Sequence, residues 1–276
     1  MGNREKLSIG IIVTTYNSPD YLRQVLRGYL RQTMFPEVVV VADDGSTGET
    51  AAVVEEIAAV APFAVRHVWQ EDQGFRAARI RNLAAKSCWA DYLIFTDGDC
   101  VPHPRFVADH ARLARDTWFV QGKRMLLDKE VSSDFSYPGW RRLLGLCLRG
   151  KASGWHHLLR VPGLALAKRG LRGVKTCNLA LFRRHFFAVN GCNEEFVGWG
   201  REDAELVARL YKYGLRRRDP LFSALVYHLW HRENSREGLA RNDELLESVS
   251  RGSGFRCANG ITREFGEDLS LALEEN

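Results

Sequence analysis

Apolar runs and amphipathic stretches alternate along the first hundred residues of the chain. The first of these runs, over 7–15, is rich in β-branched residues and lacks polar alternation, which is typical of a strand covered on both faces. Between the runs, apolar residues recur at the three- and four-residue spacing of helices. We predict strands over 7–15, 38–41, 64–70 and 92–95. We predict helices over 18–30, 46–60 and 75–86, the second beginning with a Ser46–Glu49 capping box.

This order of strands and helices predicts a parallel, doubly wound α/β sheet. Ligands bind such sheets outside the carboxyl ends of the strands. Polar clusters follow three of the predicted strands, at residues 14–17, 43–44 and 97–99. A role in the core explains the strands but not these polar endings, so we expect a functional edge there.

The second half of the chain has a weaker pattern. Residues 138–173 are rich in Leu, Gly, Trp and Arg and show no clear period. Beyond them we predict strands over 174–182 and 221–230, helices over 183–189, 202–213 and 242–250, and a Gly-rich loop over 190–200.

Length and composition narrow the class of protein. The chain has 276 residues, 45% of them hydrophobic and 26% charged, which suits one large α/β domain or a domain with an appended lobe. No apolar run is long enough to span a bilayer, and the polar start Met1–Lys6 predicts no signal peptide. The six cysteines form no Cys-x-x-Cys pair, so we expect reduced thiols without a zinc site. These features favour a cytoplasmic enzyme.

Positive charge is concentrated in the middle of the chain. The net charge is only +5, but residues 135–193 contain eleven Lys or Arg and no Asp or Glu. Such a basic segment favours an anionic partner: a nucleotide diphosphate, an acidic lipid surface or a nucleic acid. Its mixture of Trp, Leu and Arg, from Trp140 to Arg172, suits peripheral contact with the inner face of an anionic membrane. A basic loop that covers an active site explains the segment equally well.

Two carboxylates, Asp97 and Asp99, stand one residue apart at the exit of the fourth strand. Gly98 between them lets the backbone turn tightly. Hard oxygen ligands at a strand end suit a divalent cation that carries a diphosphate, Mn²⁺ or Mg²⁺. We expect Asp99 to bind the metal, and Asp97 to hold the ribose or the water shell of the ion. A plain surface turn is the alternative.

His228 and His231 stand three residues apart at the end of the last predicted strand. A strand places such residues on opposite faces, so both reach one ion only if the chain turns there. A pair of hydrogen-bonded, half-buried histidines is the simpler alternative. Imidazole beside carboxylate favours Mn²⁺ over Mg²⁺.

Residues 198–203 place a Trp between two glycines, just before two acids. Glu202 and Asp203 fall in the first turn of a predicted helix, where the helix dipole stabilises carboxylates whatever their role. A helix start does not explain Trp199, whose indole is suited to stacking on a sugar face. A carboxylate beside that indole is placed to accept a proton from a hydroxyl group.

The helix over 75–86 carries polar side chains that either contact phosphate or form a solvated surface. They are Arg76, Arg79, Arg81 and Asn82. The chain has no Walker motif and no Gly-x-Gly-x-x-Gly. The phosphates of a bound nucleotide would therefore be neutralised by metal and arginine rather than by a glycine cradle.

In their order and spacing, these motifs resemble those of a family 2 glycosyltransferase of the GT-A fold, from residue 7 to about residue 232. The segments that carry the resemblance are 12–17 (IVTTYN), 42–46 (ADDGS), 74–82 (GFRAARIRN), 95–99 (FTDGD) and 198–206 (GWGREDAEL). The last segment and the His-Leu-Trp-His at 228–231 also resemble the C-terminal part of galactosyltransferases and chondroitin-polymerase-type enzymes.

The resemblance implies inverting transfer of a sugar from a UDP-sugar to a hydroxyl of a glycan or lipid-linked acceptor. It also implies site residues. The expected contacts with the nucleotide-sugar are Thr14, Tyr16 and Asp44 at the uridine, Asp97 at the ribose, and Arg76, Arg79, Asn82 and Trp199. The expected metal ligands are Asp99, His228 and His231, and the expected catalytic residues are the base Asp203 and the acceptor-contacting Glu202. The family commonly has Gly where this chain has Arg201, which leaves the acceptor open.

We expect a GT-A domain over 1–232, with a nucleotide-binding half at 1–103, an acceptor-side half at 104–232, and a C-terminal extension at 233–276. Three other classes share some features. A nucleotidyltransferase also uses an acidic metal pair, but normally with a Gly-rich phosphate loop that this chain lacks. A nucleic-acid-binding module needs an exposed sheet or a groove-entering helix for its basic residues, so we expect no nucleic acid partner. A non-catalytic sugar-binding relative does not account for the intact acids.

Overall fold

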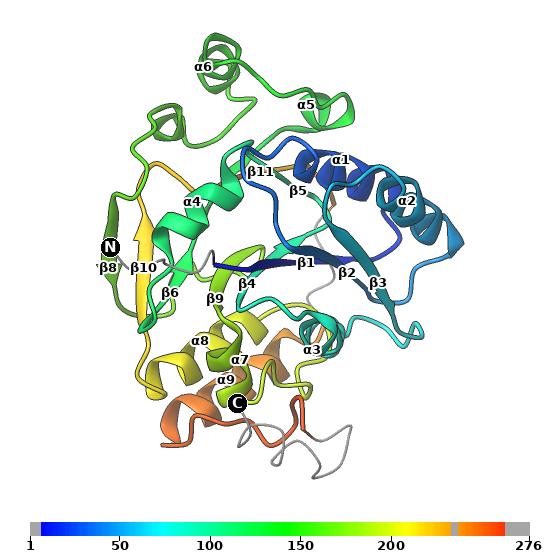
Figure 1. Cartoon of the computed structure of the whole chain (residues 1–276). Coiled ribbons are helices and arrows are strands. Elements are labelled where there is room, and N and C mark those ends of the chain that lie inside the picture. Colours follow the sequence, from blue (N-terminus) through cyan, green and yellow to red (C-terminus); the bar gives the residue numbers. More distant parts are fainter. Residues whose placement is uncertain (1–6, 233–236, 263–276) are drawn as a thin grey trace, which may run out of the picture.

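A twisted sheet of eight strands runs through the centre of the molecule (Figure 1). The computed structural model describes residues 7–232 and 237–262, so Met1–Lys6, on which the absence of a signal peptide was predicted, lies outside it. The strand order is β3-β2-β1-β4-β9-β6-β10-β8. The strands are β1 (Ile9–Thr15), β2 (Val38–Asp43), β3 (Ala64–Trp69), β4 (Tyr92–Asp97), β6 (Trp118–Gln121), β8 (Ala165–Lys168), β9 (Asn178–Phe182) and β10 (Arg216–Pro220).

The N-terminal half of this sheet is parallel. β1 pairs in parallel with β2 and β4, and β2 pairs in parallel with β3. β9 then runs antiparallel between β4 and β6, and β8 pairs antiparallel with β10 at the edge. The predicted fold class, a mostly parallel α/β sheet, is confirmed, and the antiparallel strands all belong to the second half of the chain.

Helices cover both faces of the sheet. On one face lie α1 (Pro19–Tyr29), α2 (Gly48–Ala58) and α4 (Phe106–Leu113). On the other lie α3 (Ala77–Ser87), α7 (Arg183–Ala188) and α8 (Glu202–Lys212). Neighbouring residues of β1 serve the two cores in turn: Ile11 and Val13 pack under α1 and α2, whereas Ile12 packs under α3. The burial of both faces of β1 is why this strand shows no polar alternation.

A second sheet of three strands joins distant parts of the chain. It consists of β5 (Cys100–Pro102), β11 (Leu225–His228) and β7 (Lys123–Leu126), in that order. β11 pairs antiparallel with β5 in a register that sets His228 opposite Cys100. This pairing carries the histidines at the end of β11 to the turn that contains Asp99.

The remaining elements lie at the periphery. α5 (Lys129–Ser133), α6 (Trp140–Leu148) and the 3-10 helix η1 (Trp155–Leu158) belong to a lobe that stands out beyond α4 and α1 in Figure 1. α9 (Leu239–Arg251) packs on α8, where Lys212 donates to the carbonyl of Gly252 at 2.6 Å. Among the described residues, no helix is long and apolar enough to cross a bilayer.

Several predicted boundaries were wrong. The strand over 221–230 is β11, limited to 225–228, and the strand over 174–182 is β9, limited to 178–182. α2 begins at Gly48 after Thr47, without the predicted capping box, because the Ser46 hydroxyl accepts a hydrogen bond from the Asn17 backbone N–H at 2.8 Å. The prediction missed β10, whose sequence is Arg-Arg-Arg-Asp-Pro, because its buried charges pair with one another rather than forming an apolar run.

Candidate active site

The carboxyl ends of β1, β2 and β4 meet at one edge of the sheet. The Gly98 N–H donates to the Thr14 carbonyl at 2.7 Å, and the Asp44 N–H donates to the Thr15 carbonyl at 3.0 Å. The loops that follow the three strands are therefore tied together by backbone hydrogen bonds. The predicted polar edge exists, and its three clusters are neighbours.

Gly98 is required by close packing rather than by an unusual backbone angle. A Cβ atom at this position would lie 2.8 Å from the Thr15 hydroxyl and 3.0 Å from the Thr15 Cβ. Its φ angle is not in the left-handed region that favours glycine. The sequence motif Asp-Gly-Asp thus reflects how closely the turn after β4 approaches β1.

Arg81 of α3 lies at the centre of the site. Its side chain is only 5% exposed. Nε donates to the Thr14 hydroxyl at 3.1 Å, and Nη2 donates to Asp97 Oδ1 at 3.3 Å. Nη1 lies 3.5 Å from Glu202 Oε1 and 3.9 Å from Asp203 Oδ1. One guanidinium therefore connects the turn after β4 with the start of α8, about a hundred residues later in the sequence.

Negative charge exceeds positive charge around this arginine. Burial acts against the charge of Arg81, but Asp97, Asp203 and Glu202 outweigh it and raise the pKa of the guanidinium above its usual value. Burial raises the pKa of Asp97 to about 6 although Arg81 opposes it. Burial and the adjacent Asp203 raise the pKa of Glu202 to about 7. A further cation bound nearby would relieve this repulsion.

The start of α8 holds its two acids differently. The Thr176 hydroxyl donates to Asp203 Oδ1 at 2.6 Å, which fixes the direction of that carboxylate. Glu202 is more buried, and its Oε2 atom has no hydrogen-bond partner among the described residues. Asp203 is thus an oriented, partly accessible carboxylate, whereas Glu202 offers an unsatisfied oxygen to a bound molecule.

The loop before α8 has an unusual backbone. Gly198, Gly200 and Arg201 all have positive φ angles, of 81°, 106° and 77°. A residue with a Cβ is disfavoured in this conformation, which explains in physical terms why Gly suits position 201 better than Arg. The Arg201 side chain compensates by pairing with Asp243 of α9. The carbonyl of Gly200 accepts a hydrogen bond from the Asn242 amide at 2.9 Å, so α9 supports this loop.

Asp99, His228 and His231 converge on one point. His231 Nε2 lies 3.0 Å from Asp99 Oδ2, and His228 Nε2 lies 3.8 Å from the same oxygen. The chain does turn after β11: Leu229 N–H donates to the Asp99 carbonyl at 2.8 Å, and this bend carries His231 back toward His228. The buried Cys100 thiol donates to the other Asp99 oxygen at 3.2 Å.

This donor set fits a divalent cation. The hydrogen bond with Asp99 raises the pKa of His231 to about 9, and burial lowers the pKa of His228 below its usual value. Burial acts to raise the pKa of Asp99, but the two histidines outweigh it and hold that pKa below its usual value. One carboxylate and two imidazoles in contact are suitable ligands for Mn²⁺, and a cation would displace the proton that they share.

The predicted uridine contacts lie at the other end of the edge. The Asp44 carboxylate is buried and accepts hydrogen bonds from the Gln70 amide and from the Arg76 backbone N–H. Arg79 Nη1 donates to Gln70 Oε1 at 3.3 Å. The exposed Tyr16 hydroxyl donates to Asp72 Oδ2 at 2.8 Å. Gln70 and Asp72, which the sequence did not single out, thus contact the residues predicted here.

Asn82 does not reach this edge. Its side chain is 2% exposed, and its amide nitrogen donates to the Cys192 carbonyl at 2.9 Å and to Glu194 Oε1 at 2.7 Å. Its amide oxygen accepts from the Cys192 N–H at 2.8 Å. The amide therefore holds the loop after α7 in place, and the structure gives it no direction in which to contact a nucleotide. Trp199 lies partly exposed between its two glycines.

Two residues of this site were not predicted correctly. Arg81 was not expected at its centre, and Thr176 was not identified as a partner of Asp203. Arg81 is the only charged residue among the alanines at positions 77, 78, 84 and 85, which share its helix face. A charge on an apolar helix face must find buried partners, so this pattern was a readable signal. Thr176 gave no such signal, because its contact with Asp203 depends on how the chain folds between β8 and β9.

Two family models match most of the chain. The family model described as "Glycosyl transferase family 2" matches residues 10–188. The model described as "N-terminal domain of galactosyltransferase" matches residues 158–232. The two matches together include all the segments that were singled out in the sequence.

Curated relatives are similar over part of their length. Chondroitin synthase of Escherichia coli is 26% identical over 238 residues, covering 80% of this chain and 34% of that protein. Validoxylamine A glucosyltransferase of Streptomyces hygroscopicus subsp. limoneus is 29% identical over 225 residues, covering 75% of this chain and 48% of that protein. The matched segment thus spans about a third of the first of these relatives and about half of the second.

Solved structures share the fold. TarS residues 1–349 of S. aureus superpose with a TM-score of 0.62 at 18% identity, covering 88% of this chain and 65% of that one. The mannosyltransferase PcManGT of Pyrobaculum calidifontis, solved with GDP-Man and Mn²⁺, superposes with a TM-score of 0.59 at 18% identity, covering 90% of this chain and 66% of that one.

Proposed function

The chain belongs to glycosyl transferase family 2, and from this premise we propose that it is an inverting, metal-dependent enzyme that transfers a sugar from a UDP-sugar to a hydroxyl group. The observation that carries the proposal is the position of Arg81. Its guanidinium lies within 4 Å of Asp97 at the donor side and of Asp203 at the start of α8. A proton-accepting acid therefore lies beside the turn expected to hold the sugar nucleotide.

Asp203 is the proposed general base. Thr176 holds one carboxylate oxygen, which leaves the other oxygen free to face an acceptor hydroxyl. As Asp203 takes the proton, the acceptor oxygen forms a bond to the anomeric carbon on the side opposite the diphosphate. The bond from that carbon to the diphosphate oxygen breaks, and its electrons leave with the diphosphate. One base and one displacement give inversion without a covalent sugar–enzyme intermediate.

Asp99, His228 and His231 are the proposed metal ligands. A bound Mn²⁺ or Mg²⁺ supplies positive charge that stabilises the diphosphate leaving group. Arg81 contributes a fixed positive charge and sets the position of Asp97, which we propose contacts the ribose. Glu202, whose Oε2 atom is buried and unpaired, is proposed to contact the acceptor.

The proposed donor is a UDP-sugar bound through Thr14, Tyr16 and Asp44, with Arg76, Arg79 and Trp199 around it. The buried Asp44 carboxylate is suited to accepting an imide N–H of uracil. S. aureus TarS has been solved with UDP and with UDP-GlcNAc, which supports this choice, whereas PcManGT was solved with GDP-Man. We do not propose Asn82 as a donor contact, because its amide nitrogen and its amide oxygen are both hydrogen-bonded within the protein.

The proposed acceptor is a glycan or a lipid-linked saccharide, bound by the half of the domain that follows residue 103. We propose that residues 1–103 form the nucleotide-binding half, residues 104–232 the acceptor-side half, and residues 233–276 a C-terminal extension. This division is by function and not into separate structural units. β9 lies between β4 and β6, and α9 supports the loop before α8. A cytoplasmic enzyme, peripheral to the membrane, fits these proposals.

Replacing the proposed metal ligand tests the donor site. We expect Asp99→Ala to weaken Mn²⁺-dependent binding of UDP at least about tenfold, because the carboxylate that joins both histidines is lost. Titration calorimetry with UDP, with and without Mn²⁺, measures the effect. Asp20→Ala, which removes a carboxylate that is 88% exposed on α1, is the matched control and should bind like the wild type. Unchanged Mn²⁺-dependent affinity in Asp99→Ala would reject the metal assignment.

Glu202 makes stability depend on pH. Its pKa is raised from 4.5 to about 7, so the folded chain keeps a proton that the unfolded chain releases, and stability falls as the pH rises through this range. From about pH 6 to about pH 8.5, the metal-free wild type should lose about 1 kcal/mol more unfolding free energy than Glu202→Gln. Urea unfolding at both pH values measures this. Glu49→Gln, an exposed first-turn carboxylate of α2, should follow the wild type; identical pH dependence in Glu202→Gln contradicts the assignment.

A further inference from the structure

Apolar side chains are exposed in one stretch of the chain far more than elsewhere. Eighteen large apolar side chains are exposed in the described part of the chain, and eight of them fall within residues 140–166. They are Trp140, Leu144, Leu148, Trp155, Leu159, Val161, Leu164 and Leu166, which we call the docking face. A cluster of this kind marks an interaction surface rather than the scattered exposure of an ordinary monomer.

Three of these side chains form a stripe along α6. Trp140, Leu144 and Leu148 are four residues apart, so they lie on one side of the helix, and they are 66%, 37% and 79% exposed. Leu143 and Leu146 are buried and fix the helix to the body. α6 is therefore apolar on the side that holds it and apolar again along a stripe that the rest of the described chain leaves partly exposed.

The docking face is also strongly basic. Arg141 and Arg142 lie on α6, Arg149 directly follows it, and no Asp or Glu occurs between residues 135 and 193. The Arg141 guanidinium lies 5.5 Å from the centre of the Trp140 ring, an arrangement suited to an interface between apolar and aqueous phases.

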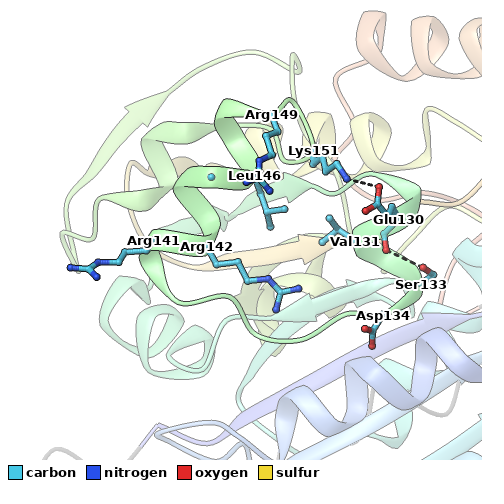
Figure 2. Close-up of a pocket in the computed structure, with 10 residues that line it drawn as sticks. Glu130, Val131, Ser133, Asp134, Arg141, Arg142, Leu146, Arg149 and Lys151 are labelled. Carbon is cyan, nitrogen blue, oxygen red and sulfur yellow. Dashed lines mark hydrogen bonds and ion pairs between the residues drawn. The ribbon is translucent and has the colours of Figure 1, made fainter.

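The basic side chains extend into a cavity of about 630 Å³ between α5 and α6 (Figure 2). Arg141, Arg142, Arg149 and Lys151 line it, against the two acids Glu130 and Asp134. Figure 2 shows Lys151 directed at Glu130, with which it pairs, whereas Arg141 extends away from the other labelled side chains. Basic groups thus lie both in the cavity and beside the stripe.

The docking face is held rigidly to the catalytic part of the molecule. Arg160 pairs with the buried Asp109 of α4, whose Oδ2 also accepts from the Ala224 N–H at 2.9 Å next to β11. α5 reaches the proposed metal loop, because the Ser132 hydroxyl accepts from the Trp230 N–H at 2.7 Å. Both contacts join the lobe that carries α6 to the part of the molecule that holds the proposed metal ligands.

We propose that α6 and the segment over 155–166 dock on an anionic lipid bilayer, with the apolar side chains in the interface and the arginines at the headgroups. A nucleic acid or an anionic polysaccharide would pair with the arginines but would leave Leu144 and Leu148 in water. A second copy bound through the same face would bring like charges together. A bilayer satisfies both features; that it also presents a lipid-linked acceptor rests on the function proposed above.

Co-sedimentation of the full chain with vesicles tests the proposal. We expect binding to vesicles that contain phosphatidylglycerol, little binding to pure phosphatidylcholine, and weaker binding at high salt. Leu144→Ser/Leu148→Ser should reduce the partition at least about tenfold, and Arg141→Gln/Arg149→Gln about as much on anionic vesicles. All four side chains are exposed, so these variants should keep the wild-type melting temperature.

Matched controls carry the same changes elsewhere. Val60→Ser/Trp89→Ser removes two exposed apolar side chains, and Arg105→Gln/Arg112→Gln removes two exposed charges; both should bind vesicles like the wild type. Absence of vesicle binding, or equal binding by Leu144→Ser/Leu148→Ser, overturns the proposal, as does a stripe-dependent dimer in sedimentation without lipid. Binding of UDP, measured on the same samples, reports on the proposed donor site separately.

Discussion

Asp203→Asn is expected to lower sugar transfer by at least about a thousandfold, because an amide cannot take the proton of the acceptor hydroxyl. The substitution keeps the size of the side chain and the hydrogen bond that the Thr176 hydroxyl donates to Asp203 Oδ1. Donor binding should therefore persist. Release of UDP from a panel of UDP-sugars measures turnover, and calorimetry with UDP and Mn²⁺ measures donor binding.

Two further variants separate the roles around this base. Thr176→Val removes only the hydroxyl that orients Asp203, so we expect a loss of about tenfold in turnover with unchanged affinity for UDP. Glu202→Gln should mainly alter the dependence on acceptor concentration. If Asp203→Asn retains nearly wild-type turnover, the base is another residue, and Glu202 is the next candidate because its carboxyl group lies in the same helical turn.

Arg81→Ala is expected to lower the unfolding free energy by about 3–5 kcal/mol, because three carboxylates lose the only buried cation that contacts all of them in the described structure. The same change should abolish transfer, since Asp97 and Asp203 are no longer held together. Urea unfolding measures the first effect and UDP release the second.

The matched variants distinguish charge from shape. Arg81→Lys keeps one positive charge but lacks the fork that reaches Thr14, Asp97 and Glu202 at once, so stability should recover partly and activity should stay low. Arg79→Ala, on the same helix, should leave the unfolding free energy within about 1 kcal/mol of the wild type. If Arg79→Ala lowers the unfolding free energy as much as Arg81→Ala does, the central position of Arg81 does not account for its contribution to stability.

The first hundred residues were largely predictable because local pattern and tertiary role agree there. The strands β1, β2 and β4 are buried on both faces, the edge strand β3 is partly buried, and each helix from α1 to α3 keeps one apolar side. The segment from residue 104 to residue 173 was not predictable in this way. Its strands are four residues long, and their positions depend on pairing with β9, β10 and β11, which come later in the chain.

Asp97 and Asp99 were predictable because they follow a predicted strand, whereas the sequence did not show which polar side chains of α3 reach the site. Arg81 and Asn82 are neighbours on α3, yet Arg81 faces the sheet edge and Asn82 faces the loop after α7. A rotation of one residue along a helix changes direction by about 100°. Only the packing of α3 on the sheet decides which of the two reaches the site.

The place of β9 in the sheet has a consequence for biosynthesis. β4 is complete once residue 97 has left the ribosome, but its antiparallel partner begins only at residue 178. Translation proceeds at about 5–20 residues per second, so the nascent chain carries β4 with one apolar, unpaired edge for several seconds. During that interval two nascent chains on one messenger can join through it. The yield of folded protein should therefore rise when translation between codons 97 and 178 is fast relative to initiation.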